Sequence, residues 1–412
     1  MTCVPCSRLW LAPLVALLLF APPARAASFS ELVKSGFEML QRRDFEEAAG
    51  SFAAALELEP ASEPARKGLA QSWAALGNDH LRAGRLRKGR ESFEKAVEAR
   101  PESAEYHLLL AQVLSREGEL RTARLETDRA LELAPESAPA RELLGDLYNR
   151  EGRLNLAAAE WEAAAQAGGS HQLAEKLRRV RRDMAAEEGM QRQTSRFFAI
   201  QYDRNVPAPL VQGFFKVLDE AFNILHDRLG DYPREEIPVI LYSQVTFRDV
   251  TLAPDWSGGL FDGRVIRIPV GGLSTVEQAV GLLNILTHEM THAFLYRMAP
   301  EGLPLWFNEG LATAFQGWDP AKIRAWFAEH PPQGLATLDD VDRALQGRGG
   351  DVTAAYCAAR LAIADLEEMR GFGSVRRIIS GVGAGEPFAA TFRDEARMEV
   401  AEFQDRWQRG LR

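Results

Sequence analysis

The sequence predicts a chain of two structural parts, an all-α repeat solenoid followed by an α+β domain. Two observations support this: a helical pattern recurs at a fixed period through the first half, and strand-like segments appear from Arg196 onward. A length of 412 residues is enough to bury more than one core. We expect an array of about four repeats over 27–167, a capping or linker helix over 168–195, and the second domain over 196–412.

The overall charge argues against one class of partner. The formal net charge is −9 at pH 7, whereas proteins that grip phosphate backbones rely on clustered Lys and Arg. We therefore expect no nucleic-acid partner.

The first 26 residues have the features of an export signal. Arg8 precedes an apolar run from Leu9 to Ala21, and Ala24-Arg25-Ala26 is a small-x-small cleavage site. This predicts an exported protein, periplasmic or extracellular, with no membrane span once the signal is removed. The alternative is an uncleaved anchor, because Pro22 and Pro23 lie close to the site.

The cysteines suggest no redox or disulfide role in the mature chain. Cys3 and Cys6 form a C-x-x-C pair, but both precede the apolar run and would leave with the signal. Cys357 then stands alone, so no intramolecular disulfide is expected.

The first half contains an internal repeat with a period of 34 residues. The segments "AGRLRKGRESFEKAVEARP", "EGELRTARLETDRALELAP" and "EGRLNLAAAEWEAAAQAGG" align without gaps. Corresponding positions include Leu86, Leu120 and Leu154; Phe93, Thr127 and Trp161; and Gly84, Gly118 and Gly152. An earlier copy lies 41 residues before the first of these, and its extra seven residues, about two helical turns, predict a lengthened helix between Glu63 and Arg82.

This helix-turn-helix period, with Pro60, Pro101 and Pro135 closing the second helices, resembles the tetratricopeptide repeat family over roughly 29–167. The resemblance implies a stacked core and a concave face that binds a protein partner. A purely structural spacer is the alternative. The polar segment 171–189 is expected to cap the stack.

The second half begins with strand signals. "RFFAIQYD" and "IPVILYS" are predicted strands with a helix between them from about Pro209 to Leu229, and "GGLFDGRVIRIPV" gives a third strand after a turn at Asp262-Gly263. Ser274 and Glu277 have capping-box spacing, and the apolar positions that follow predict one long buried helix reaching Met298.

That helix carries the sequence "HEMTH". His288 and His292 are four residues apart and therefore project from one helical face, where two imidazoles can share a tetrahedral metal. Glu289 lies about 100° round the axis, within reach of a water at that metal. The alternative is a helix with two hydrogen-bonded core histidines. A catalytic zinc needs a third protein ligand: Glu309, in the apolar segment "LPLWFNEGLATAF", is preferred over Asp319 and His330.

H-E-x-x-H followed by N-E-G-L-A resembles the gluzincin metallopeptidases, and most closely the bacterial peptidase MA-like domains, over about 196–412. The resemblance implies that His288, His292 and Glu309 bind Zn2+, that Glu289 is the general base, and that Tyr356 on a later helix stabilises the oxyanion. His330 is the fallback for that last role.

Two departures from the family pattern affect the expected activity. Only 16 residues separate His292 from Glu309, and the G-x-M-E-N segment that captures a free amino terminus is absent. This favours an endopeptidase, with a strand near Gly259 to Ile268 as an edge for extended substrate.

The sequence thus predicts an exported zinc metallopeptidase acting on a peptide or protein substrate, with the repeat array recruiting substrate or partner. One alternative is an envelope scaffold whose metallopeptidase-like domain is a metal-stabilised binding module. Another is zinc-dependent hydrolysis of a non-peptide amide.

Overall fold

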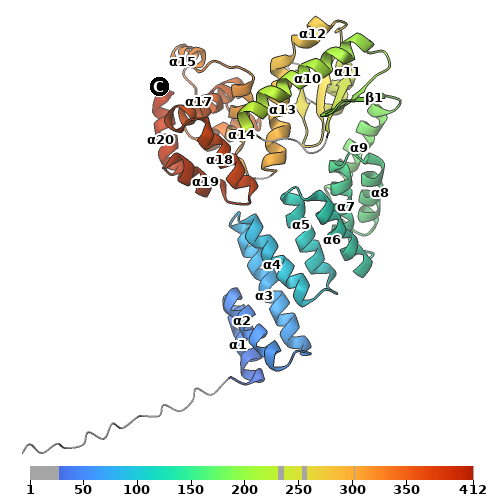
Figure 1. The fold of residues 1–412 in the computed structure, drawn as a ribbon, viewed down its shortest axis with the longest axis vertical. Helices are drawn as coiled ribbons and strands as arrows, with labels where there is room; N and C mark the ends of the chain where they lie inside the picture. Colours follow the sequence, from blue (N-terminus) through green and yellow to red (C-terminus); the bar gives the residue numbers. More distant parts are fainter. Residues whose placement is uncertain (1–26, 231–235, 253–257, 301, 412) are drawn as a thin grey trace, which may run out of the picture.

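A computed structural model describes residues 27–230, 236–252, 258–300 and 302–411. The predicted export signal, 1–26, lies outside the described residues. Figure 1 shows a curved row of helices leading from α1 to α9, with the second domain beyond it. Within the described part, no helix combines the length and apolarity needed to cross a membrane.

The repeat array consists of helix pairs with the predicted spacing. Each pair packs as a unit, α1 on α2, α3 on α4, α5 on α6 and α7 on α8. Their bounds are Phe29–Arg42, Phe45–Leu58, Glu63–Arg82, Leu86–Ala99, Ala104–Arg116, Leu120–Leu133, Ala138–Arg150 and Leu154–Gln166. The predicted long helix is α3, which has 20 residues where the others have 13 or 14.

A large side chain on the second helix fills the space left by a glycine on the first. A Cβ placed on Gly77 would lie 2.7 Å from the ring of Phe93, and one on Gly145 would lie 2.5 Å from Trp161. This close approach explains why a glycine and an aromatic residue occupy these positions in α3–α4 and α7–α8. In α5–α6 the corresponding residues are Ala111 and Thr127. The turns between paired helices also recur, because Gly118 and its equivalents adopt positive φ there.

Helix α9, Leu173–Glu187, joins the array to the second domain. Its Leu173 and Val180 extend the buried cluster around Trp161, as expected of a capping helix. Lys176 Nζ bonds Glu142 Oε1 at 2.9 Å and Asp146 Oδ1 at 2.6 Å, both on α7. The array therefore holds α9 by apolar and ionic contacts together.

The structure differs from the predicted linker at its end. Residues Gln191–Thr194 form strand β1, which pairs antiparallel with β2, so the sheet begins before the predicted boundary at Arg196. The sequence "QRQT" lacks apolar alternation because β1 is an edge strand with mostly exposed side chains. Periodicity alone could not reveal it.

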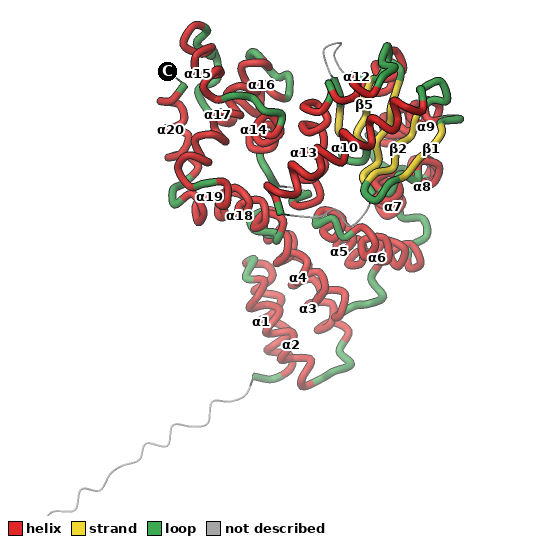
Figure 2. Tube along the Cα trace, turned by 45° about the horizontal axis from the view of Figure 1, so that its top comes forward, coloured by secondary structure: helices red, strands yellow, loops and turns green. Residues whose placement is uncertain are grey.

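The sheet has the strand order β1-β2-β3-β5-β4, parallel in its centre and antiparallel at both edges. Figure 2 shows these strands in yellow beside helix α10. Their bounds are β2 Phe198–Tyr202, β3 Ile237–Tyr242, β4 Leu260–Phe261 and β5 Ile266–Pro269. One face packs on α10, Ala208–Leu229, and on α13. The other face packs on α9 and on α11, Gln244–Thr251.

The single long helix predicted from Ser274 to Met298 is wrong. Two helices occupy the segment, α12 Val276–Val280 and α13 Leu283–Met298, and they separate at Gly281, a poor helix former. The capping box also lies one residue later, because Thr275 Oγ1 accepts the N–H of Gln278 at 3.3 Å. The histidine motif therefore sits on a shorter helix with its own start.

The remaining chain is helical. Its helices are α14 Leu305–Phe315, α15 Pro320–Glu329, α16 Leu338–Leu345, α17 Val352–Arg370, α18 Phe372–Gly383, α19 Phe388–Ala396 and α20 Val400–Gly410. Helices α14 and α17 cross closely at Gly310, where an added Cβ would lie 2.4 Å from the carbonyl oxygen of Ala359. Small residues at the crossing, including the buried Ala355 and Ala359, make this approach possible.

Candidate metal centre

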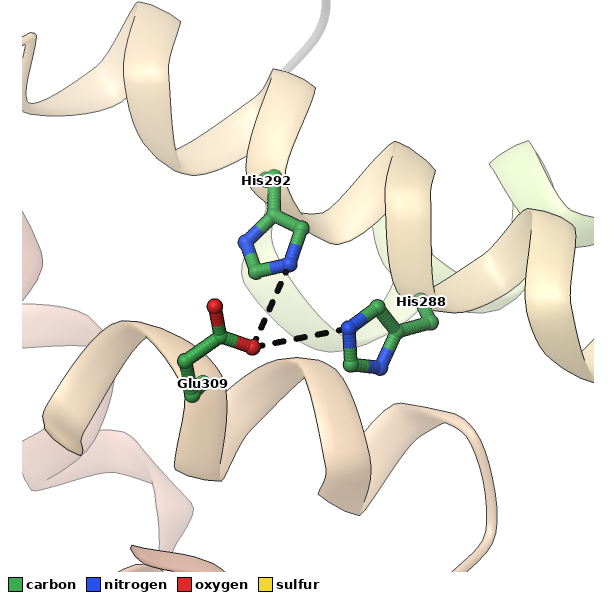
Figure 3. Close-up of side chains that lie close together, drawn as sticks. All are labelled: His288, His292 and Glu309. Carbon is green, nitrogen blue, oxygen red and sulfur yellow. Dashed lines mark ion pairs between the residues drawn. The ribbon is translucent and has the colours of Figure 1, made fainter. Parts of the chain in front are cut away.

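Two histidines and one carboxylate converge between α13 and α14 (Figure 3). The Nε2 atoms of His288 and His292 each lie 3.5 Å from Oε2 of Glu309. One donor atom from each residue lies within 4.8 Å of the other two. Across the described part of the chain, no second group of three histidine, cysteine or acidic side chains meets this condition.

The histidines reach this position because one helical turn separates them. Their rings are 4.8 Å apart and nearly perpendicular, so both Nε2 atoms are directed toward the same point. His292 Nδ1 lies 2.7 Å from Oδ1 of Asn308. An amide oxygen only accepts, so Nδ1 carries the proton and Nε2 keeps its lone pair for a metal.

Asn308 was not among the residues singled out by sequence. The sequence feature that could have indicated Asn308 is its position next to Glu309 in "FNEG", on the same helical turn as the predicted third ligand. Because it fixes a histidine tautomer without binding a metal itself, ligand spacing does not identify it.

The charges at the site support a place for a cation. Burial opposes protonation of His288, but Glu309 and Glu289 outweigh it and raise its pKa. Burial likewise opposes ionisation of Glu309, yet His292 and His288 outweigh it and lower that pKa. The carboxylates thus favour positive charge at His288, and the imidazoles favour negative charge at Glu309.

The donor set fits zinc. Glu309 Oε2 is buried and faces the two imidazoles at 3.5 Å, without a well-formed hydrogen bond to any group of the described structure. A metal ion between the three donors would satisfy this oxygen more fully than the two long contacts do. Two imidazoles and one carboxylate with an open fourth position are a donor set of catalytic zinc sites.

Glu289 stands apart from the three donors. Its side chain is 8% exposed, and Oε2 accepts the backbone N–H of Phe261, on β4, at 2.8 Å. Gly259 permits this contact between strand and helix, since an added Cβ would lie 2.9 Å from Glu289 Cγ. The carboxylate is therefore fixed in orientation while it remains free of the ligand group.

The site opens into a cavity of about 810 Å³. The three donor residues, Glu289 and Tyr356 all line it, as does the segment from Gly258 to Phe261. Strand β4 is the outermost strand on this side of the sheet. The expected single edge strand, Gly259 to Ile268, is therefore divided: β4 lies at the sheet edge beside the site, whereas β5 lies between β3 and β4.

Tyr356 reaches the cavity from α17. Its ring centroid lies 6.3 Å from that of His288. Burial raises the pKa of its hydroxyl, and the charges of Glu309 and Glu289 raise it further. The hydroxyl therefore stays protonated and can donate a hydrogen bond into the cavity.

The two weaker candidates lie elsewhere. His330 is exposed, bonds the carbonyl oxygen of Trp326 through Nδ1 at 3.2 Å, and stacks on that indole. Asp319 caps α15 by accepting the N–H of Ala321 at 2.9 Å. Neither residue lines the cavity, so the prediction that Glu309 is the better candidate agrees with the geometry.

Comparison with known proteins bears on the N-terminal half. The family model described as tetratricopeptide repeat matches residues 74–138 and 109–172. Comparison with curated protein sequences finds no match. Among solved structures, the Arabidopsis OM64 TPR domain is similar to 28% of this chain over 97% of its own length, with 15% identity and a TM-score of 0.27.

Two further structures are similar at the same level. The Sgt2 TPR domain from Aspergillus fumigatus shares 19% identity over 28% of this chain and 79% of its own, with a TM-score of 0.27. YrrB, described as a TPR protein with an unusual peptide-binding site, shares 22% identity over 39% of this chain and 78% of its own, with a TM-score of 0.31. From the family match, the N-terminal helical region of this chain contains tetratricopeptide repeats.

Proposed function

We propose that this chain is an exported zinc-dependent endopeptidase whose tetratricopeptide repeats recruit a substrate or partner protein. One observation carries the proposal: the donor atoms of His288, His292 and Glu309 converge on one point in a cavity while Glu289 remains outside the set. The buried Glu309 Oε2 has only long contacts to the two imidazoles, which supports a metal ion between the three donors over a metal-free histidine pair.

His288, His292 and Glu309 would hold the zinc, with Asn308 fixing the tautomer of His292. Bound zinc supplies Lewis-acid activation of a water and of a substrate carbonyl. Glu289 accepts the proton of the attacking water, and its bond from Phe261 keeps the carboxylate turned toward the cavity. The hydroxyl of Tyr356 donates to the oxyanion that forms on the substrate.

The position of β4 favours internal cleavage. This edge strand lines the cavity, so an extended substrate can lie along it beside Glu289 and bond to backbone groups other than the Phe261 N–H, which donates to Glu289. Pairing of this kind needs no chain terminus. The proposed activity is therefore that of an endopeptidase.

The test combines zinc analysis with digestion of a mixed protein substrate by the mature chain. Wild type and Glu289→Gln should each hold about one zinc, and Glu289→Gln should cleave about 10²- to 10⁴-fold more slowly. Glu277→Gln, an exposed carboxylate on the neighbouring helix α12, is the matched control and should cleave normally. Zinc-loaded wild type that cleaves nothing would contradict the proposal.

The second candidate function is that of a scaffold protein, because tetratricopeptide repeats can bind a protein partner whether or not the second domain catalyses a reaction. In this case zinc would only stabilise the second domain. A partner retained equally by wild type and Glu289→Gln, and cleaved by neither, would favour scaffolding over proteolysis.

A further inference from the structure

A buried ionic cluster connects the repeat array to the candidate site. It lies on the sheet face away from α13, between α9 and the β4–β5 hairpin. Its centre is Arg267 on β5, which is only 1% exposed. A buried guanidinium needs partners for its donors, and here they come from two different parts of the molecule.

Arg267 forms hydrogen bonds with Asp183, Asp262 and Tyr242, and a longer ion pair with Glu187 Oε1 of α9 at 3.8 Å. Arg267 Nη2 lies 2.7 Å from Oδ2 of Asp183, on α9, and 3.0 Å from Oδ2 of Asp262, in the β4–β5 turn. Arg267 Nη1 lies 2.6 Å from the hydroxyl of Tyr242. One side chain thus fastens the capping helix of the array to the hairpin turn.

Further contacts fix the turn itself. Asp262 Oδ1 accepts the N–H groups of Arg264 and Val265 at 3.1 and 3.0 Å, which closes the turn. Arg179 of α9 adds a bond to Asp262 Oδ2 at 3.0 Å. The hairpin is therefore held from its α9 side at the residue that directly follows β4.

The other side of the same hairpin touches the candidate base. The residue before Asp262 is Phe261, whose N–H donates to Glu289. Gly259, on the same strand segment, lies against the Glu289 side chain. A displacement of the turn would consequently move the Phe261 N–H that donates to this carboxylate, together with the β4 edge.

We propose that Asp183, Arg267 and Asp262 are positioning residues that set Glu289 and the β4 edge for the reaction, so that the repeat array forms part of the catalytic framework. The inference rests on the proposed peptidase function for its catalytic consequence. The structural part of the inference, that α9 fixes the position of the β4–β5 hairpin, does not depend on any enzymatic activity.

The test uses the full mature chain and Asp183→Asn, which keeps the shape of the side chain and removes its charge. Amide hydrogen exchange over residues 258–268 should become about threefold to tenfold faster, as for loss of a net hydrogen bond, with exchange in α14 and α17 unchanged. In the cleavage assay kcat should fall about 10- to 100-fold, comparable with loss of an outer-shell residue, while zinc stays near one per chain.

Glu175→Gln is the matched control, because this carboxylate lies on the same helix in an exposed pair with Arg178. It should change neither exchange nor kcat. If Asp183→Asn does not fold, Tyr242→Phe removes only one partner of Arg267 and should give a smaller change in the same direction.

Unchanged exchange over 258–268 in a folded variant would overturn the positioning role. So would normal kcat despite faster exchange, or a loss of zinc that accounts for the lower rate. Wild type that binds zinc without cleaving would refute the peptidase proposal alone, since the exchange measurement needs no substrate.

Discussion

The repeat array and the candidate site are both built from packed helices, but they are assembled differently. In the array each helix packs mainly on its neighbours in sequence, and a glycine-aromatic contact recurs in α1–α2, α3–α4 and α7–α8. The site instead combines α13, α14, α17 and an edge strand, each used once. A substitution in the array should therefore affect the packing of its own helix pair, and equivalent substitutions in other pairs should have similar effects. A substitution in the site should have an effect that depends on the role of that one residue.

The largest expected difference concerns two Glu–His pairs, one in each region. Glu309→Gln should weaken zinc binding by more than about 100-fold, since loss of a ligand exceeds loss of an outer-shell partner. In the array, Glu126 lies 2.6 Å from Nδ1 of His107, and Glu126→Gln should leave zinc binding unchanged. Metal analysis after dialysis measures both. Equal zinc content in both variants would remove Glu309 from the ligand set.

The next prediction compares Tyr356, which is half-buried at the cavity, with a buried tyrosine of the array. Tyr356→Phe should lower kcat about 10²- to 10³-fold with zinc retained, because one hydrogen bond to the oxyanion is lost. Tyr106→Phe, in the array, should leave kcat unaltered. The measurement is kcat for steady-state cleavage of one peptide substrate by both variants. Equal kcat values would show that Tyr356 contributes only to packing.

A third prediction compares close helix contacts. Gly310→Ala places a Cβ 2.4 Å from a backbone carbonyl and should lower the free energy of unfolding by about 1–3 kcal/mol. Gly145→Ala meets the side chain of Trp161, which can shift, and should cost less. Gly50→Ala, with no atom within 4 Å, should stabilise its helix by roughly 0.5–1 kcal/mol. Urea denaturation provides the values, and a neutral Gly310→Ala would show that the α14–α17 crossing can relax.

The smallest effect is expected from pH at the interface between the two regions. Burial opposes ionisation of Asp262, but Arg267 and Arg264 outweigh it and hold its pKa below the usual range. A lowered folded-state pKa stabilises the fold above the unfolded value of about 3.9. That stabilisation is lost as pH falls through the folded value.

Thermal unfolding measured in steps below about pH 5 should therefore show a loss of stability. Asp262→Asn should show a shallower acid dependence and lower stability at neutral pH. An identical pH profile in both proteins would exclude Asp262 as a source of acid sensitivity.

The sequence was most informative where contacts are local. The 34-residue period located the helix pairs and even the bounds of α3. This was possible because the residues that pack within a repeat are close together in the sequence. Glu309 could be singled out because a carboxylate amid apolar residues is costly without a partner. Both inferences depend on short stretches of chain.

Features set by distant contacts were missed or misplaced. Strand β1 is polar and lies at a sheet edge, so apolar alternation does not mark it. The break at Gly281 is different, because glycine is a poor helix former and the signal was local. Asn308 acts through His292, and Arg267 gains its role from Asp183 on another element. No local pattern indicates such partnerships, because either residue alone is compatible with many environments.

The placement of the three donor residues has a consequence for the order in which the chain is made. His288, His292 and Glu309 all belong to two consecutive helices, whereas Tyr356 belongs to a helix further along the chain. During synthesis, the full ligand set therefore emerges before the residue assigned to the oxyanion. Under the proposed function, a growing chain carries all three metal donors before it carries the residue assigned to the oxyanion.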